Sequence, residues 1–466
     1  MIQNRLKAIK RSIIIIFLSF STHFFPLYAQ EKGVTPESTE AQDVEPKNYW
    51  ALIIGISEYE YFNSLDYADK DALMFYEYLK SDLGDKLPDH NVKILLNEEA
   101  TGAAIEKGFG WLVKNVEEGD IVYIYYSGHG GQEDLSYKKL GYLIGHNSFD
   151  NTLSNGGNYP MFYLQTILET LSFQNKATTY FIADACHSGK SDGEDLEYFN
   201  TTLSSEVGQI TKVLSAQGNE LSFENAKWGG GHGVFTYYLV KGLAGEADNS
   251  PKDGIVTIRE LNRYLDDHVP PETNFKQNPT IISQNVLSKV SVINEDFLAS
   301  LNSESLNLEL DHSSLLASRN VVDGFTEEDM VFYDSVVNLL KQYNFHNKAN
   351  SGALDLFDDY FEKHNNERLK SQLLEKIYIS GMDYTQDFIN MFLSDSHKRD
   401  SINYDENDAI QLLEWMEPKY TIEMEKNQID SRTIFFKSVK VHWDYHTGIL
   451  TDSDVWIGII RVLAAS

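Results

Sequence analysis

The chain has 466 residues, of which 42% are hydrophobic and 23% are charged. This length predicts two or three domains, and the composition is that of a globular protein with a buried core. The formal net charge of −31 argues against nucleic acid as a partner, because an acidic surface repels a phosphate backbone. The same acidity keeps a protein soluble and favours cationic ligands.

The N-terminal segment has the pattern of an export signal. Basic residues precede the apolar run Ile13–Phe20, and Ala29 ends a short exit segment. We therefore expect residues 1–29 to be a signal peptide and the protein to be exported, to the periplasm or the extracellular space. Because Leu27 is unusual at such a cleavage site, an uncleaved N-terminal anchor is the alternative, and a membrane would be involved only in that case. The polar residues 30–48 are expected to be a linker.

From Tyr49 onwards, short apolar runs alternate with helical patterns. The runs typical of buried strands are Trp50–Ser57, Val92–Leu96, Ile121–Tyr126, Thr178–Ala183 and Lys212–Ser215. The helical patterns are Leu65–Leu79, Ala103–Val116 with Thr101 as its cap, Tyr163–Leu171 and Phe235–Leu243. This alternation predicts an α/β fold, a mostly parallel sheet sandwiched by helices.

The alternation fades near residue 295, and a different pattern follows. Long helix-like segments occupy Phe325–Gln342, Leu354–His364 and Glu367–Tyr378. We therefore expect a second, mostly helical C-terminal domain over residues 296–466. Within it, the β-branched and aromatic run Thr433–Trp443 is expected to form a strand.

The only cysteine, Cys186, and one histidine, His129, each follow a predicted strand. Because the carboxyl ends of parallel strands meet at one edge of a sheet, we expect the two side chains to share that edge. An imidazole there can take the proton of the thiol and return it to a leaving amine. The N–H groups of Gly130 and Cys186 could then face a developing oxyanion. A lone cysteine or histidine is usually structural, but the ordered pair favours a cysteine peptidase.

Two segments carry a family resemblance. Tyr126–Gly131 and Asp184–Gly189 resemble the signature segments of the caspase-like cysteine peptidases, closest to metacaspases and their bacterial relatives. Ala51–Ser57 followed by Leu65–Ala72 resembles the first strand and first helix of that family. The resemblance covers residues 49–295, which we therefore expect to form a caspase-like peptidase domain.

The resemblance also implies residue roles. His129 would be the catalytic imidazole and Cys186 the nucleophile. Asp71 and Asp184 match the positions at which metacaspase-like members bind a basic P1 side chain, the residue before the cut. Two carboxylates suit a guanidinium or ammonium group, so cleavage after Arg or Lys is expected. The structural alternatives are a solvated helix carboxylate for Asp71 and a turn-stabilising side chain for Asp184.

Three further residues lie near these motifs. His187 is expected to have a structural role, because at the exit of the strand it should point away from the thiol. His232 is expected to be a structural loop residue, because one imidazole serves one thiol. Family members often cut themselves after the cysteine strand, but Lys190 is the only Lys or Arg of 187–211 and lies too close to Cys186 to reach back. We therefore expect weak or absent self-cleavage there.

A calcium site is not supported by the sequence. Asn249–Glu260 partly fits a calcium loop, but Pro251 stands where a carboxylate belongs. Thr257 and Glu260 instead suit a capping box that opens a helix. Gly141–Asp150, which corresponds to the acidic region of calcium-activated metacaspases, has few carboxylates. We expect no bound metal and no cofactor.

Two functions therefore compete. The leading hypothesis is an exported cysteine endopeptidase that uses His129 and Cys186 to cut a peptide or protein substrate after Arg or Lys. The alternative is a non-catalytic caspase-like scaffold that binds a protein partner through its C-terminal domain.

Overall fold

The computed structural model describes residues 46–132, 141–149, 157–187, 210–217, 220–249, 251–302, 325–346, 352–393, 406–420 and 423–446. The expected signal peptide and Lys190 lie outside these ranges, so the predictions made for them stay predictions. From Pro46 onwards, the described residues belong to one compact unit. Within the described ranges, no helix combines the length and the apolarity that a membrane crossing requires.

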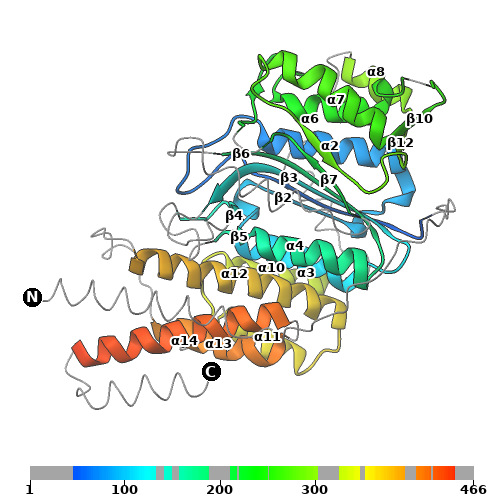
Figure 1. The fold of residues 1–466 in the computed structure, drawn as a ribbon. Coiled ribbons are helices and arrows are strands. Elements are labelled where there is room, and N and C mark those ends of the chain that lie inside the picture. The colour runs from blue at the N-terminus through cyan, green and yellow to red at the C-terminus, as the bar shows by residue number, and fades with distance from the viewer. Residues whose placement is uncertain are drawn as a thin grey trace, which may run out of the picture. The chain divides into compact units, whose positions relative to one another are not determined.

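A twisted sheet lies at the centre of this unit (Figure 1). Six of its strands follow one another in the order β11 (Thr280–Ile282), β7 (Ile210–Leu214), β6 (Thr178–His187), β3 (Ile121–Gln132), β1 (Tyr49–Gly55) and β2 (Val92–Leu96). The pairs from β7 to β2 are parallel, whereas β11 is antiparallel. Two short antiparallel strands, β4 (Gly141–Leu143) and β5 (Tyr159–Pro160), extend the end of β3. The predicted mostly parallel sheet is confirmed.

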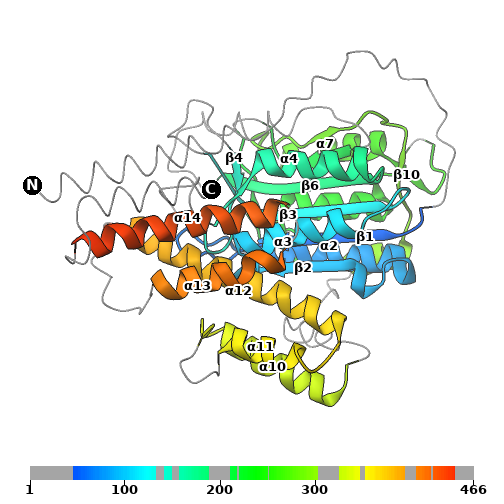
Figure 2. The ribbon, with the colours of Figure 1, turned by 90° about the horizontal axis from the view of Figure 1, so that it is seen from below.

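Helices cover both faces of the sheet (Figures 1 and 2). On one face lie α2 (Ala68–Leu83), α6 (Val234–Lys241), α7 (Ile258–Glu272) and α8 (Glu295–Asn302), and on the other lie α3 (Gly102–Asn115) and α4 (Met161–Glu169). Neighbouring residues of β1 therefore enter different cores: Ile53 packs with the first set of helices and Leu52 with the second. This is why the strands read as continuous apolar runs instead of alternating ones.

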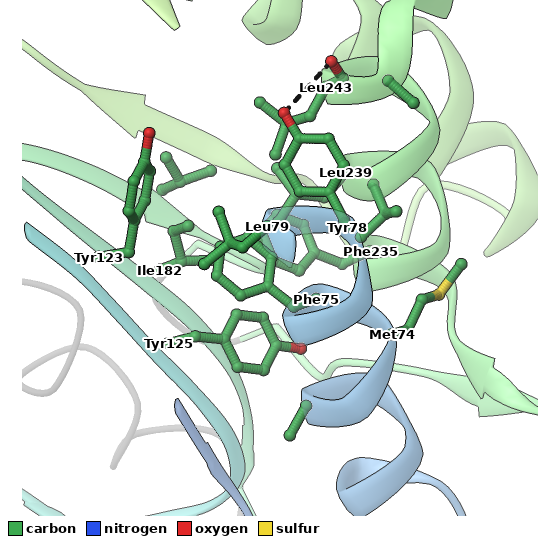
Figure 3. Close-up of a cluster of buried hydrophobic side chains, with 14 of the residues drawn as sticks. Met74, Phe75, Tyr78, Leu79, Tyr123, Tyr125, Ile182, Phe235, Leu239 and Leu243 are labelled. Atoms are coloured by element: carbon green, nitrogen blue, oxygen red, sulfur yellow. Dashed lines mark hydrogen bonds between the residues drawn. The ribbon is translucent and has the colours of Figure 1, made fainter. Parts of the chain in front are cut away.

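Helix α2 is held against β3 by an aromatic cluster (Figure 3). The ring of Phe75 stacks on that of Tyr125, with centroids 4.7 Å apart. The hydroxyl of Tyr78 donates to the main-chain oxygen of Leu243 at 3.5 Å. Truncating a buried aromatic such as Phe75 to alanine costs about 3–5 kcal/mol. Because Asp71 lies one turn before Phe75, this packing also fixes where the Asp71 carboxylate points.

Two separate two-stranded antiparallel sheets accompany the main sheet in the described ranges. They are β8 (Glu224–Asn225) with β9 (His232–Gly233), and β10 (Ile255–Thr257) with β12 (Lys289–Val292). The predicted capping box at the start of α7 is confirmed, since Glu260 and Thr257 bond reciprocally. The predicted cap of α3 is confirmed too: Thr101 accepts from the N–H of Ala104.

The C-terminal part of the chain is helical, as predicted. Its helices are α10 (Glu327–Leu340), α11 (Ala353–Phe361), α12 (Glu367–Leu393), α13 (Glu406–Met416) and α14 (Glu423–His446). They share a core of their own, which Ala103 of α3 joins. The strand expected at Thr433–Trp443 is wrong, because this run lies within α14. Ile429 and Phe436, two helical turns apart, are both buried, so burial on one helix face decided its structure over β propensity.

Candidate active site

The structure brings the main chains of His129 and Cys186 side by side. In the parallel pair of β3 and β6, His129 is in register with Cys186. Both strands run further than the predicted ends: β3 continues to Gln132, where β4 pairs with its last three residues, and β6 continues along β3 to His187. His129 and Cys186 therefore lie inside strands and not in the turns after them. They share the carboxyl edge of the sheet, where neighbouring strands are about 4.8 Å apart.

The loop after β1 orients the ring of His129. The Nε2 atom of His129 lies 2.7 Å from the main-chain oxygen of Asn63. The N–H of His129 donates to the hydroxyl of Tyr59 at 2.7 Å, and the two rings are 4.6 Å apart. A carbonyl oxygen only accepts hydrogen bonds, so Nε2 carries the proton and Nδ1 is the basic nitrogen of the neutral ring. Sequence reasoning missed this loop, since no side-chain pattern signals a main-chain acceptor.

Asp71 and Asp184, which come from different elements, line the same pocket. Asp71 projects from α2, and its carboxylate accepts from Nδ1 of His232 at 2.9 Å and from the N–H of Gly233 at 3.1 Å. Asp184 accepts from the hydroxyls of Ser222 at 2.5 Å and Thr236 at 2.7 Å. The lining residues are Leu65, Ala68, Asp71, Ser127, Asp184, Ser222, Phe223, Glu224 and Gly233.

Gly233 makes the close approach of these carboxylates possible. A β-carbon at this position would lie 2.7 Å from Oδ2 of Asp184 and 2.9 Å from Oδ2 of Asp71. Both distances are too short for a real contact. The space between the two carboxylates therefore stays open only because residue 233 is a glycine, whose side chain is a single hydrogen atom.

Glu224 adds a third carboxylate that sequence reasoning missed. Its two oxygens accept from the N–H groups of Asp66 at 2.8 Å and Tyr67 at 3.0 Å, just before α2 begins. The bonds tie the β8–β9 pair to the start of α2. Glu224 precedes the glycine run, and nothing in the spacing along the chain shows that it reaches the pocket.

The pocket is acidic and desolvated. Burial raises the pKa of Asp184 to about 6, with a further contribution from the charge of Asp71. Burial also raises the pKa values of Asp71 and Glu224, and the bond from His232 opposes this shift at Asp71. Neither Lys nor Arg is among the residues that line the pocket. A cationic guest would supply the missing counter-charge through charge-assisted hydrogen bonds.

The pocket lies next to His129 and Cys186 along the same two strands. Ser127 is in register with Asp184, and each lies two residues before His129 or Cys186 on its own strand. Two residues of a strand span roughly 6.6 Å. A long side chain with a terminal charge could therefore enter the pocket while its own main chain lies at the His129–Cys186 edge.

No group of three or more metal-ligating side chains occurs in the part of the chain that the structure describes. In the segment that partly resembles a calcium loop, the Glu260 carboxylate bonds to the main-chain N–H and the hydroxyl of Thr257. Asp253 accepts from the N–H of Ile255, as in an Asx turn. These side chains have structural partners here.

Known proteins with similar sequences are proteases by name. The chain is 34% identical over 163 residues to a probable protease of a Desulfuromonadales bacterium. The aligned residues make up 31% of this chain and 19% of that protease. The chain is 27% identical over 188 residues to metacaspase-1A of Aspergillus oryzae, which covers 36% of this chain and 42% of that one. The chain thus spans less than half the length of these relatives. A solved structure of pro-sf-caspase-1 is 15% identical, covers 54% of this chain and 97% of that one, and has a TM-score of 0.33.

A family model described as the caspase domain matches residues 48–291. This match includes every strand of the main sheet, His129, Cys186 and the acidic pocket. The chain therefore belongs to the caspase-domain family.

Proposed function

We propose that this protein is a cysteine endopeptidase that cuts peptide bonds after Arg or Lys. Cys186 is the nucleophile and His129 is the acid–base group. One observation supports the proposal above all. His129 and Cys186 are in register on neighbouring strands, and two residues earlier on the same strands Ser127 and Asp184 line an acidic, desolvated pocket.

Each half of the reaction uses two proton transfers. Nδ1 of His129 takes the proton of the Cys186 thiol, and the thiolate attacks the carbonyl carbon of the substrate. The N–H groups of Gly130 and Cys186 donate to the oxyanion, and His129 returns its proton to the leaving amine. Water then attacks the thioester: His129 takes its proton and returns it to the sulfur of Cys186 as the carbon–sulfur bond breaks, which releases the acid product. The bond from Nε2 of His129 to Asn63 keeps the ring in the required tautomer.

The pocket selects the residue before the cut. Asp71, Asp184 and Glu224 bind the guanidinium of Arg or the ammonium of Lys. An aspartate in the same pocket would meet three carboxylates and no cation among the residues that line it. Like charges exclude it, which makes acidic P1 residues poor substrates.

A panel of fluorogenic peptides that end in Arg, Lys or Asp tests this function. We expect the wild type to cleave the Arg and Lys peptides, and Cys186→Ala and His129→Ala to lose that cleavage. Cleavage after Asp alone would remove the roles of Asp71 and Asp184. No Cys186-dependent cleavage of any peptide would favour the scaffold that binds a partner through its C-terminal domain.

Export is part of the proposal and rests on the N-terminal pattern alone. We expect the secreted protein to begin at Gln30, which N-terminal sequencing of material from an exporting host would show. A mature protein that keeps residues 1–29 and sediments with membranes would support the anchor instead.

A further inference from the structure

Helix α12 of the C-terminal helices touches the loop that follows β4. The Asp383 carboxylate accepts a 3.1 Å hydrogen bond from Nδ2 of Asn147, and the hydroxyl of Thr101 donates to it as well. The Oδ1 atom of Asn147 accepts from the N–H of Gly102 at 3.2 Å. Asn147 is buried, so these contacts fix its side chain from α3 and from α12 together.

The same loop holds the main chain of His129. The N–H of Ile144 donates to the main-chain oxygen of His129 at 3.1 Å. The hydroxyl of Tyr126 donates to this oxygen at 2.5 Å and to that of Ile144 at 3.1 Å. His129 is thus tied to a segment that begins three residues before Asn147.

The loop also holds the residues on both sides of Tyr59. Nδ1 of His146 lies 2.7 Å from the main-chain oxygen of Glu58, and the N–H of Glu60 donates to the main-chain oxygen of His146 at 3.0 Å. The hydroxyl of Tyr59 in turn accepts from His129. A displacement of Asn147 would therefore reach two of the groups that contact His129, the N–H of Ile144 and the hydroxyl of Tyr59.

Helix α14 keeps the Asp383 turn of α12 in place. The guanidinium of Arg432 donates to the main-chain oxygen of Met382 at 3.1 Å, to the hydroxyl of Thr385 at 2.8 Å and to Oε1 of Gln386 at 2.9 Å. These acceptors lie one residue before Asp383 and two and three residues after it. The turn of α12 that carries the Asp383 carboxylate is therefore hydrogen-bonded to α14.

We propose that Asp383 is a positioning residue for the imidazole of His129, acting through Asn147 and the loop Ile144–Ser148. The C-terminal helices are then a part of the peptidase and not an independent appendage. This inference rests on the proposed function of His129.

The same helix supplies a matched control. Glu375 of α12 forms an ion pair with Lys93 of β2. It lies eight residues before Asp383, roughly 12 Å along the helix, and its ion-pair partner is on β2, whereas Asp383 bonds to Asn147 of the loop. Glu375→Gln therefore loosens the attachment of α12 without touching the route to His129.

The test uses the full chain and two readouts. The first is kcat and KM on an Arg peptide. The second is the pH dependence of alkylation by iodoacetamide, which reports the contact of the imidazole with the thiol because Cys186 is the only cysteine. The variants are Asp383→Ala, Asn147→Asp, the double variant Asn147→Asp with Asp383→Asn, and Glu375→Gln.

Asp383→Ala and Asn147→Asp should each lower kcat by about tenfold or more, with KM within about twofold. Both should also move the alkylation midpoint towards that of an ordinary thiol. The double variant, which restores an amide–carboxylate pair in the reverse order, should recover most of the kcat, and Glu375→Gln should resemble the wild type.

Wild-type kcat and alkylation in Asp383→Ala would overturn the inference, as would an equal loss in Glu375→Gln. If no peptide is cleaved, the proposed function fails, but a shifted alkylation midpoint in Asp383→Ala would still support the positioning role. A wild-type midpoint already equal to that of free cysteine would overturn both.

Discussion

The Oδ2 atoms of Asp71 and Asp184 lie close together beside Gly233: a β-carbon at residue 233 would be 2.9 Å from the first and 2.7 Å from the second. Asp71 accepts there from the N–H of Gly233, and Asp184 accepts from the hydroxyl of Thr236. Two buried carboxylates thus share one small space, with no lysine or arginine among the lining residues. Such an arrangement stores unfavourable electrostatic energy that a bound cation would relieve.

Gly233→Ala should therefore abolish recognition of basic side chains. The added methyl group would fall 2.7 Å from Asp184 and 2.9 Å from Asp71, in the space that the cation needs. We expect kcat/KM for Arg and Lys peptides to fall by about a hundredfold or more. Alkylation of Cys186 by iodoacetamide is the control, because this small reagent does not enter the pocket. An unchanged kcat/KM would place the substrate side chain elsewhere.

The activity on basic peptides should fall as the pH drops through the pKa of Asp184. This carboxyl group titrates at about 6, because burial and the charge of Asp71 disfavour its ionised form. Only the ionised form attracts the substrate cation, so kcat/KM should rise with pH through this range. This rise is the acid limb of the pH profile. Asp184→Asn should lower kcat/KM by about a hundredfold and should also abolish the acid limb.

Ser222→Ala tests the assignment of that limb. The Ser222 hydroxyl donates to the carboxylate, and this bond favours the ionised form. Its removal should raise the pKa of Asp184 and move the acid limb to higher pH. A limb that stays in place in Ser222→Ala would mean that another group controls it.

Glu224→Gln should have a smaller effect than Asp184→Asn. Glu224 is only half-buried, so water screens its charge more than that of Asp184. We expect a loss of about three- to tenfold in kcat/KM for Arg and Lys peptides. The amide oxygen can still accept from Asp66 or Tyr67, so the thermal midpoint should change little. A loss as large as that of Asp184→Asn would mean that Glu224 is the main partner of the cation.

The parts of this site that sequence could predict are those set by strand order. His129 and Cys186 follow two apolar runs, which predicted that they share one edge of the sheet, and the register pairs these two residues. Glu224 and the oxygen of Asn63 could not be predicted, because both reach the site through loop conformation and not through periodicity. The helix at Thr433–Trp443 was misjudged for a related reason: its aromatic residues favour strands locally, but packing among other helices decides their structure.

The free energy of unfolding should fall as the pH rises, because a buried glutamate lies where α3 contacts the C-terminal helices. Glu106 of α3 is buried, and burial raises its pKa from 4.5 to about 8. The charged groups around it are Lys107 on the same helix, and Glu425 and Arg432 on α14. The nearby Asp383 of α12 has a pKa of about 7, also raised mainly by burial.

The difference in proton binding between the folded and unfolded states decides how stability changes with pH. Between pH 4.5 and about 8, the folded state keeps the Glu106 proton that the unfolded state has lost. Each pH unit of such a difference lowers the free energy of unfolding by about 1.4 kcal/mol. Stability is therefore highest at the acidic end of this range and falls towards pH 8.

Urea denaturation at pH 5.5, 7 and 8 measures this slope. Glu106→Gln, which cannot ionise, should flatten it and should exceed the wild type in stability at pH 8 by a few kcal/mol, about 1.4 kcal/mol for each pH unit above the unfolded pKa. Glu118→Gln is the matched control, since Glu118 is an exposed glutamate whose variant should keep the wild-type slope. A Glu106→Gln variant that keeps the wild-type slope would show that Glu106 loses its proton equally in the folded and unfolded states, and would contradict this assignment.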